Sequence, residues 1–430
     1  MMKKWIGPSL AAALIAAVLL PGCGGPSIPV AAPTSTANLV FGCNWSFEST
    51  SQNANFAYPD TNAVYWVAAV PDSIPSGDKI EISGASATAR YFSYEIYTED
   101  GVSEADLSDA QIFGQGTTPA DAVTSGQSYT VSIVYSTLET SSGTTLVANP
   151  SVVSPRAPAH KYLFYRLYLP TSGADEFSNL PTLTYVAANG TRTPLSATPD
   201  QPSCNYILQN IQNTISGVST TSSSSSSSGG SSSSSSGSTT AVSPPAMKVF
   251  TSSTGIFQNL DVTYMFEETS TSLGDMLIVR GKAPAFATGS QSPQVRYWSV
   301  CSDRFDKPTS VVACVADQDA TIGSDGYYNV IISPQTPPSG YQTLFNYLSA
   351  GADAFGTPIY RQLLANPLFL QSAKNNKDSL DVSLTMGAYY PETTYCSNSV
   401  FSANLSAGAA AVFSACQSSE GSGSVTDTGN

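Results

Sequence analysis

The sequence is poor in charge, and above all in positive charge. Only 11% of its 430 residues are Asp, Glu, Lys or Arg, less than half of the roughly 25% typical of soluble domains. Its 17 basic residues face 31 acidic ones, for a net charge of −14. A chain this acidic lacks the basic field on which DNA and RNA binding depends. We therefore expect no nucleic-acid partner.

Motifs for catalysis and metal binding are also scarce. The chain holds one histidine, His160, no Cys-x-x-Cys pair and no Gly-x-Ser-x-Gly nucleophile motif. A zinc site of the usual Cys/His kind or a histidine-based triad requires more than this. We expect no zinc and no other firm cofactor, and we interpret His160 as an ordinary loop histidine.

Long apolar runs are missing except near the start of the chain. Residues 1–21 read MMKKWIGPSLAAALIAAVLLP, two lysines followed by an apolar run that is short for a membrane span. The next residues complete Leu20-Pro21-Gly22-Cys23, which resembles the bacterial lipobox. That resemblance implies a signal peptide at 1–22, which is cleaved off in front of Cys23, and a lipid that Cys23 already carries. Gly24 in place of an aspartate favours the outer membrane of a bacterial envelope over the inner one.

Cysteine usage agrees with export. Without Cys23 six cysteines remain, and an even number in an oxidising compartment predicts three disulfides. Their order along the chain favours a staple of the first half's ends, a bridged hairpin, and a link from the C-terminal helix to a strand. The expected pairs are Cys43–Cys204, Cys301–Cys314 and Cys396–Cys416.

Composition divides the chain into two blocks of similar size. Residues 216–245 read SGVSTTSSSSSSSGGSSSSSSGSTTAVSPP, a polyserine linker that cannot bury a core. Tethers are also expected near both ends. The predicted organisation is signal peptide 1–22, lipidated tether 23–39, first domain 40–212, linker 213–245, second domain 246–416 and a tail at 417–430.

The two blocks repeat each other's motifs in the same order. Gly77–Gly84 matches Gly274–Gly281, and Ala89–Tyr94 matches Val295–Val300. Apolar and polar residues alternate within such segments, and Gly, Pro, Asp or Ser close them, as in antiparallel strands. We therefore predict a mainly β protein with two tandem, duplicated antiparallel β-sandwich or jelly-roll-like domains and a few short helices. The expected helices are 205–215, 341–348, 358–364 and 404–415.

Three groups of residues are candidate sites. Asp317, Asp319 and Asp325 lie in a Gly-containing segment that could bind calcium, although the spacing departs from an EF-hand loop and a solvated acidic turn is the alternative. Trp66 and Trp298 belong to adjacent aromatic pairs, of which one member could form an exposed platform for sugars; core packing is the alternative.

Two repeated arginines form the third group. Arg90 and Arg296 each precede an aromatic pair, and arginine is rare in this chain. A buried arginine needs a carboxylate partner, for which the repeat-matched Asp78 and Asp275 are candidates. We expect an internal Arg–Asp pair in each copy; anion binding in a cleft is the alternative.

A resemblance rests on three segments of the second block. Arg296–Cys301 reads RYWSVC, Val312–Asp317 reads VACVAD and Gly326–Val330 reads GYYNV. The pattern resembles uncharacterised exported bacterial lipoproteins with an R-Y-W-S-x-C core strand, and is loosely similar to the C-terminal β-domain of DUF1254/DUF1214 proteins. Arg90–Ser93 (RYFS) repeats part of it. The resemblance implies a β-sandwich and transfers no catalytic residue.

Together these features predict a lipid-anchored envelope lipoprotein. We expect a non-enzymatic binding or interaction protein that displays two β-domains to a polysaccharide or an envelope protein. Two domains on one tether could gain avidity for a polymer. The alternatives are a carbohydrate-active hydrolase that uses paired acidic residues and a structural envelope component.

Overall fold

A computed structural model describes residues 43–422 apart from 116–117, 151–159, 172–178, 196–201, 218–245, 251–254, 270–272, 288–291 and 352–355. The predicted signal peptide, Cys23, most of the polyserine linker and the end of the tail lie outside the described residues. In the described part of the chain, no helix combines the length and apolar character needed to cross a membrane.

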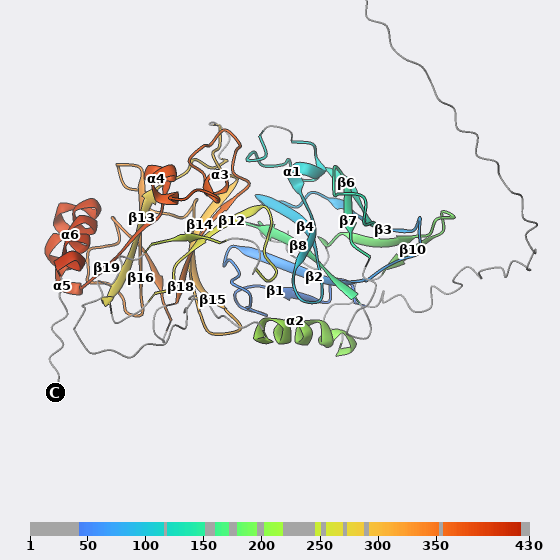
Figure 1. Cartoon of the computed structure of the whole chain (residues 1–430), viewed down its shortest axis with the longest axis horizontal. Coiled ribbons are helices and arrows are strands. Elements are labelled where there is room, and N and C mark those ends of the chain that lie inside the picture. The colour runs from blue at the N-terminus through green and yellow to red at the C-terminus, as the bar shows by residue number, and fades with distance from the viewer. Residues whose placement is uncertain are drawn as a thin grey trace, which may run out of the picture. The chain divides into compact units, whose positions relative to one another are not determined.

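The first half is a sandwich of two five-stranded sheets (Figure 1). One sheet has the order β1-β2-β8-β4-β5 and the other β10-β9-β3-β6-β7. The strands are β1 Phe47–Ser49, β2 Ala63–Pro71, β3 Lys79–Ala85, β4 Tyr91–Tyr97, β5 Ser103–Ser108, β6 Ser128–Tyr135, β7 Thr145–Ala148, β8 His160–Tyr168, β9 Thr182–Val186 and β10 Arg192–Leu195. Two helices, α1 Asp109–Ile112 and α2 Asn205–Gly217, accompany them, with a 3-10 turn at Pro202–Cys204.

The second half repeats this order, except that one of its sheets has four strands and no counterpart of β10 among the described residues. Its sheets are β11-β12-β18-β14-β15 and β17-β16-β13-β19. The strands are β11 Lys248–Val249, β12 Val262–Phe266, β13 Met276–Lys282, β14 Tyr297–Asp303, β15 Val311–Ala316, β16 Tyr327–Ser333, β17 Asn346–Ser349, β18 Thr357–Leu363 and β19 Glu392–Cys396. Its helices are α3 Ala373–Asn376, α4 Val382–Met386, α5 Asn398–Asn404 and α6 Ala409–Ser422, with 3-10 turns at Gly387–Tyr389 and Leu405–Ala407.

The repeat extends to fine detail. Strand pairs are antiparallel except β6–β7 and β16–β17, which occupy the same place in each half and are both parallel. Gly84 of β3 and Gly281 of β13 face Tyr129 and Tyr328 in the same register. A Cβ on Gly281 would lie 2.5 Å from the hydroxyl of Tyr328, so only glycine fits beside that ring. The predicted mainly β fold with two related sandwiches is confirmed.

The helices show where local pattern is decisive and where it is not. The helix expected over 205–215 is present as α2, with Ile207, Ile211 and Ile215 buried against the first half. The helix predicted over 358–364 is wrong, because that segment is β18, the central strand between β12 and β14. The helix predicted over 341–348 is also wrong, since its end forms β17, and the one over 404–415 is divided between α5 and α6.

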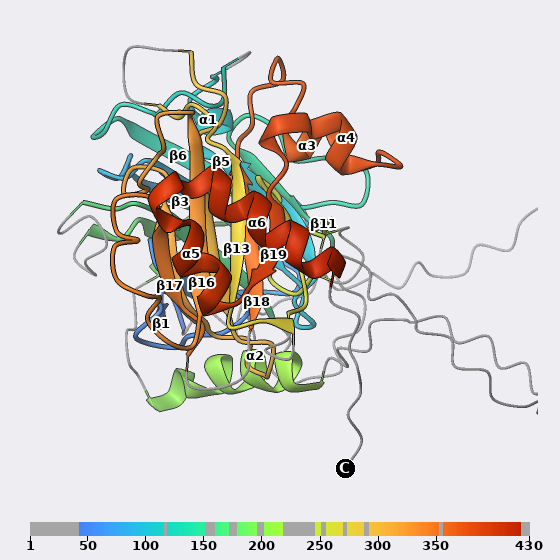
Figure 2. The same cartoon turned by 90° about the vertical axis from the view of Figure 1, so that its left-hand side faces the viewer.

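Three disulfides fasten the ends and edges of the sheets. Cys43–Cys204 closes the first half and ties it to α2, and Cys301–Cys314 joins directly opposed residues of β14 and β15. Cys396–Cys416 holds α6 to β19, and Figure 2 shows α6 lying across this sheet. These are the pairs that the sequence predicts.

The two halves belong to one compact unit, residues 39–430. The β1-β2-β8-β4-β5 sheet of the first half and the β11-β12-β18-β14-β15 sheet of the second meet through a buried apolar cluster; we call them the joining sheets. The cluster includes Tyr65, Tyr91, Tyr168, Tyr297 and Leu363. The sites of interest are built on this junction.

Candidate functional site at the junction of the halves

The centre of the junction is a set of buried tyrosines whose hydroxyls reach across to the other half. Tyr91 of β4 donates to Asp261 at 2.7 Å, and Tyr297 of β14 donates to Asp60 at 2.9 Å. The rings of Tyr168 and Tyr297 lie 5.3 Å apart, edge to face. Each ring thus buries apolar area, and the hydroxyls of Tyr91 and Tyr297 are satisfied by the opposite half.

The repeated arginines Arg90 and Arg296 pair reciprocally across the junction. Arg296 donates to both carboxylate oxygens of Asp109 in the first half, at 2.9 and 3.1 Å. Arg90 donates to Asp317 in the second half and to Gln318 at 2.8 Å. The two aspartates are equivalent, since each directly follows the last strand of its joining sheet. Burial raises the pKa of both Asp109 and Asp317 to about 6, opposed by the adjacent guanidinium groups.

This exchange corrects the Arg–Asp pairs predicted within each copy. Asp78 instead accepts from the hydroxyl of Tyr185 and the backbone N–H of Ala188, and Asp275 accepts from the N–H of Asn398. Both aspartates therefore brace turns beside β3 and β13, and neither pairs with Arg90 or Arg296. Arg90 and Arg296 are structural cross-links and are not free to bind an anion in a cleft.

A second pair of equivalent arginines, Arg166 of β8 and Arg361 of β18, lies deeper in the junction. Arg166 donates to Glu95 at 2.5 Å, to the hydroxyl of Tyr97, and to the carbonyl of Phe257 in the second half at 2.8 Å. Arg361 donates to the carbonyl of Tyr58 in the first half at 2.7 Å. The sequence offers one signal of this pair, since each arginine directly follows a tyrosine in its half.

A pocket of about 30 Å³ lies between these two arginines, with Tyr58, Tyr65, Tyr168 and Tyr264 among its lining residues. Space of this size admits one or two particles as large as water. It is far too small for a sugar ring. The pocket is therefore a site for a very small ligand or for water.

The carboxyl group of Asp303 lies buried in the same region. Neither of its oxygens has a hydrogen-bond partner among the described residues, and its side chain is fully enclosed. Burial raises its pKa to about 8, with Arg361 opposing and Asp60 adding to the rise. A carboxyl group in this state is largely protonated at neutral pH.

The predicted aromatic platform is not at the tryptophans. Trp298 is fully buried in the second core beside Tyr328, with ring centroids 5.0 Å apart, and Trp66 is buried in the first core. Strand alternation decides this outcome, because each tryptophan occupies the inward position of its adjacent aromatic pair. A sugar platform built on Trp66 and Trp298 is thereby contradicted.

The predicted calcium ligands are held apart by arginines. Asp317 pairs with Arg90, whereas Asp325 pairs with Arg280 at 2.5 Å. Desolvation acts to raise the pKa of Asp325, but the hydrogen bonds from Arg280 and the backbone N–H of Tyr327 outweigh it and lower that pKa. Asp319 enters the turn through its backbone N–H, which donates to the carbonyl of Ala316. Two of the three carboxylates are already neutralised by different partners, so the loop does not present a converging set of oxygens for Ca²⁺.

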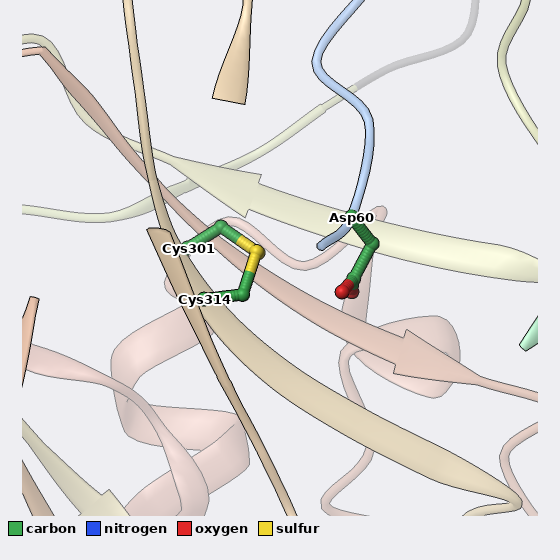
Figure 3. A group of neighbouring side chains, drawn as sticks. All are labelled: Asp60, Cys301 and Cys314. Atoms are coloured by element: carbon green, nitrogen blue, oxygen red, sulfur yellow. A yellow bond between two sulfur atoms is a disulfide. The ribbon is translucent and has the colours of Figure 1, made fainter. Parts of the chain in front are cut away.

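One other group has the spacing of metal ligands among the described residues: Asp60, Cys301 and Cys314 (Figure 3). Its sulfur atoms are joined in a disulfide and so are not the thiolates that a metal needs. The Asp60 carboxylate already accepts from Tyr297 and Ser299. The donor set does not fit a metal ion.

His160 is the first residue of β8 and is almost fully buried. Its Nδ1 lies 3.2 Å from a carboxylate oxygen of Glu99, and its ring packs edge to face against Tyr162 and Tyr206. It therefore lies on a strand beneath α2 rather than in the loop expected from the sequence.

The second half also carries an exposed apolar feature that sequence reasoning missed. Between β18 and β19 the chain makes an excursion that includes α3 and α4, which lie side by side in Figure 2. We call this segment the leucine excursion. Four of its leucines are exposed: Leu368 (84%), Leu370 (71%), Leu380 (109%) and Leu384 (77%). The spacing of Leu380 and Leu384, one helical turn apart among polar residues, was the available signal.

Comparisons with known proteins assign no family. No family model and no curated protein match the chain. Solved structures with some similarity include an uncharacterized protein from Burkholderia cenocepacia, at 12% identity over 76% of this chain and 80% of the other, with a TM-score of 0.45. The VPA0106 protein from Vibrio parahaemolyticus follows at 9% identity over 79% and 90%, with a TM-score of 0.40. At these TM-scores neither similarity supports a functional assignment, and the resemblance to DUF1254/DUF1214 proteins stays a prediction.

Proposed function

We propose that this protein is a lipid-anchored lipoprotein of the bacterial cell envelope that binds another envelope protein and catalyses no reaction. The exposed leucine excursion carries this proposal. Solvated leucines on one segment are unfavourable unless a partner covers them, and Leu380 and Leu384 belong to no core cluster of the described residues.

The address rests on residues 1–23 and on the cysteines. The lipobox-like Leu20–Cys23 follows a short apolar run, and three disulfides are typical of a chain that folds in an oxidising compartment. Attachment through lipid on Cys23 would hold the folded unit beside the membrane, with the outer membrane favoured by Gly24.

A protein partner fits the excursion better than a lipid surface or a polysaccharide. Lys374, Lys377, Asp378 and Asp381 intersperse the leucines, so apolar side chains are surrounded by charges of both signs, as in protein interfaces. The net charge of −14 opposes contact with anionic lipid headgroups. The polysaccharide alternative loses its main support with the burial of Trp66 and Trp298.

Lipidation is tested by replacing Cys23 with alanine in the full chain. We expect the parent protein to fractionate with membranes and its mass to include acyl groups on an N-terminal cysteine. Cys23→Ala should abolish both, since one cysteine carries the anchor. A soluble, unacylated parent protein would contradict the proposed address.

The binding surface is tested by crosslinking from the excursion. A photoreactive residue at position 384 of the full chain should give a discrete protein adduct in cells, and Leu380→Ser with Leu370→Ser should reduce that adduct at least tenfold. The matched control is Leu138→Ser, which changes an isolated leucine of the first half that is 94% exposed. All of these substitutions alter solvated side chains, so melting temperatures should stay within about 1 °C.

Three results would overturn the proposed partner class. An adduct between two copies of this chain would replace it with self-association. Crosslinking to lipid alone would replace it with membrane docking. Equal adduct yields from the double variant and the Leu138→Ser control would show that the leucines do not form the contact.

A further inference from the structure

Two arginines line the pocket, and they differ in their partners. Arg166 pairs with a carboxylate, whereas Arg361 has no ion pair with the described residues. The two arginines occupy equivalent positions in register, because Arg166 pairs with Tyr65 and Ser93 and Arg361 pairs with Tyr264 and Ser299. Each also donates to a carbonyl of the opposite half, and the residues that offer these carbonyls, Phe257 and Tyr58, both have positive φ. The pocket therefore lies between two copies of one arrangement.

The copies differ at two positions near these arginines, because Glu95 and Tyr97 of β4 correspond to Cys301 and Asp303 of β14. In the first half, Nη1 of Arg166 is bound by Glu95 of β4. Counting from the paired Ser93 and Ser299, the equivalent of Glu95 in β14 is Cys301, which is held in a disulfide with Cys314. The carboxylate that neutralises the first arginine is thus replaced by a neutral sulfur in the second half.

Arg361 shows the consequence. Its Nη1 is buried and has no hydrogen-bond partner among the described residues, whereas Nη2 donates to the carbonyls of Tyr58 and Pro59. No carboxylate lies within ion-pair distance of it in the described part of the chain. A buried guanidinium group that lacks an anionic partner is strongly unfavourable.

We propose that this pocket binds a small monovalent anion of halide size, which supplies to Arg361 the negative charge that Glu95 supplies to Arg166. The two guanidinium groups provide the positive potential, and the tyrosines around the pocket provide hydroxyl groups that can donate to an anion. The pocket volume of about 30 Å³ admits chloride or bromide and excludes larger organic anions. The bound ion would help to hold the two halves together.

Binding should strengthen as the pH falls. Asp303 on β14 lies close enough to Arg361 of β18 to interact with its charge, while Asp60 and Tyr58 of the segment before β2 and Glu268 after β12 add further charges or dipoles nearby. Protonation of Asp303, whose pKa burial raises to about 8, removes one negative charge that competes for Arg361. An anion therefore meets less repulsion below pH 8 than above it.

The test uses the whole protein at constant ionic strength, with sodium chloride or bromide against sodium gluconate. Equal ionic strength keeps general screening the same, and comparison with the Arg361→Gln variant separates binding in the pocket from each anion's general effect on stability. We expect the melting temperature to be higher by about 2 °C or more in the halide salts, and this difference to be larger at about pH 6 than at about pH 9. Crystals grown with bromide should show its anomalous signal beside Arg361.

Variants connect the effect to the pocket. Arg361→Gln should remove the halide-specific shift, whereas Arg192→Gln, which changes an exposed arginine of β10, should retain it. If Arg361→Gln does not fold, the bromide signal in the parent protein decides. Equal melting temperatures in chloride and gluconate, or bromide absent from the pocket, would overturn the proposal and leave a site that holds only water.

Discussion

Arg296 illustrates how a charge can be buried at the scale of a single residue. Its side chain is fully enclosed, and it binds Asp109, the side chain of Gln115 and the backbone carbonyls of Arg90 and Pro119. Every one of these partners belongs to the other half of the molecule. The geometry satisfies the guanidinium fork, which a lysine at the same position could not do.

Replacing Arg296 should therefore destabilise the protein strongly. Arg296→Met leaves the Asp109 carboxylate buried without its cation, which costs about 3–5 kcal/mol of unfolding free energy. Urea denaturation measures this, and the added change Asp109→Asn should recover part of the loss in a double-mutant cycle. Arg192→Gln serves as the control and should have little effect. Simple additivity of the two junction substitutions would contradict the direct pairing.

The carboxyl groups of the junction give a second prediction at the residue scale. Burial raises the pKa of Asp303 to about 8 and those of Glu95 and Asp261 to about 7 in the folded protein. Their pKa values in the unfolded chain are near 4. A raised folded pKa means that the folded state binds the proton more tightly, so the contribution to stability is complete below about pH 4 and is lost as the pH rises through 7–8.

The melting temperature should accordingly fall between about pH 6 and pH 9. Asp303→Asn removes one of these titrating groups and should make the fall smaller. Asp325→Asn is the matched control, because the pKa of Asp325 is lowered and its titration lies at acid pH. A melting temperature that rises with pH over this interval, or an unchanged slope in Asp303→Asn, would show that Asp303 is ionised in the folded state.

At the scale of elements, disulfides attach the helices α2 and α6 to the sheets. Helix α2 packs through three isoleucines beneath the first half, and Cys204 at its start joins Cys43 ahead of β1. The two cysteines are separated by 161 positions, whereas Cys396 and Cys416 are separated by 20. If a disulfide stabilises mainly by restricting the unfolded chain, the disulfide that closes the longer loop should contribute more to the free energy of unfolding.

Removal of each disulfide tests that account. Loop entropy predicts a loss of about 5 kcal/mol for Cys43→Ala with Cys204→Ala and about 3 kcal/mol for Cys396→Ala with Cys416→Ala. Urea denaturation of the two double variants gives the comparison, with the parent protein under non-reducing conditions as reference. The reverse order would show that native packing around α6, not loop length, governs the contribution.

The segment 357–363 shows how an element's type can depend on its surroundings. Pro358 and the following residues suit the first turn of a helix, yet the segment is β18, with all seven residues buried. It pairs with β12 on one side and β14 on the other. Two complete ladders in a buried sheet outweigh a weak local preference for helix.

At the scale of the whole molecule, the two sandwiches are joined by exchanged segments. The backbone N–H groups of Ala57 and Tyr58 donate to the carbonyls of Pro308 and Thr309 in the second half, while Phe257 packs against α2 and the first half. Together with the reciprocal arginine pairs, these contacts make the junction resemble a domain core. Avidity from two independently moving domains is therefore not the arrangement that the structure shows.

Cutting the chain between the halves should leave them associated. A protease site inserted after Gly230, in the serine-rich segment, would give two fragments that elute together in size-exclusion chromatography after cleavage. The double variant Arg90→Gln with Arg296→Gln should weaken this association, whereas Arg192→Gln should not. Separation of the fragments of the parent protein would contradict a core-like junction.

The amino-acid sequence by itself determined the features that depend on local or repeated patterns. Alternation identified the strands such as β3 and β16, the order of cysteines indicated the three disulfides, and the matched motifs indicated two related sandwiches. The tertiary structure alone decided the partners of buried charges. Arg90 and Arg296 select aspartates about 200 positions away, because the facing of two sheets, and no local spacing, brings those groups out of water together. Alternation places Tyr297 and Trp298 on opposite faces of β14, and the tertiary structure covers both faces, so Trp298 is core. The replacement of Glu95 by Cys301 leaves Arg361 beside a small pocket.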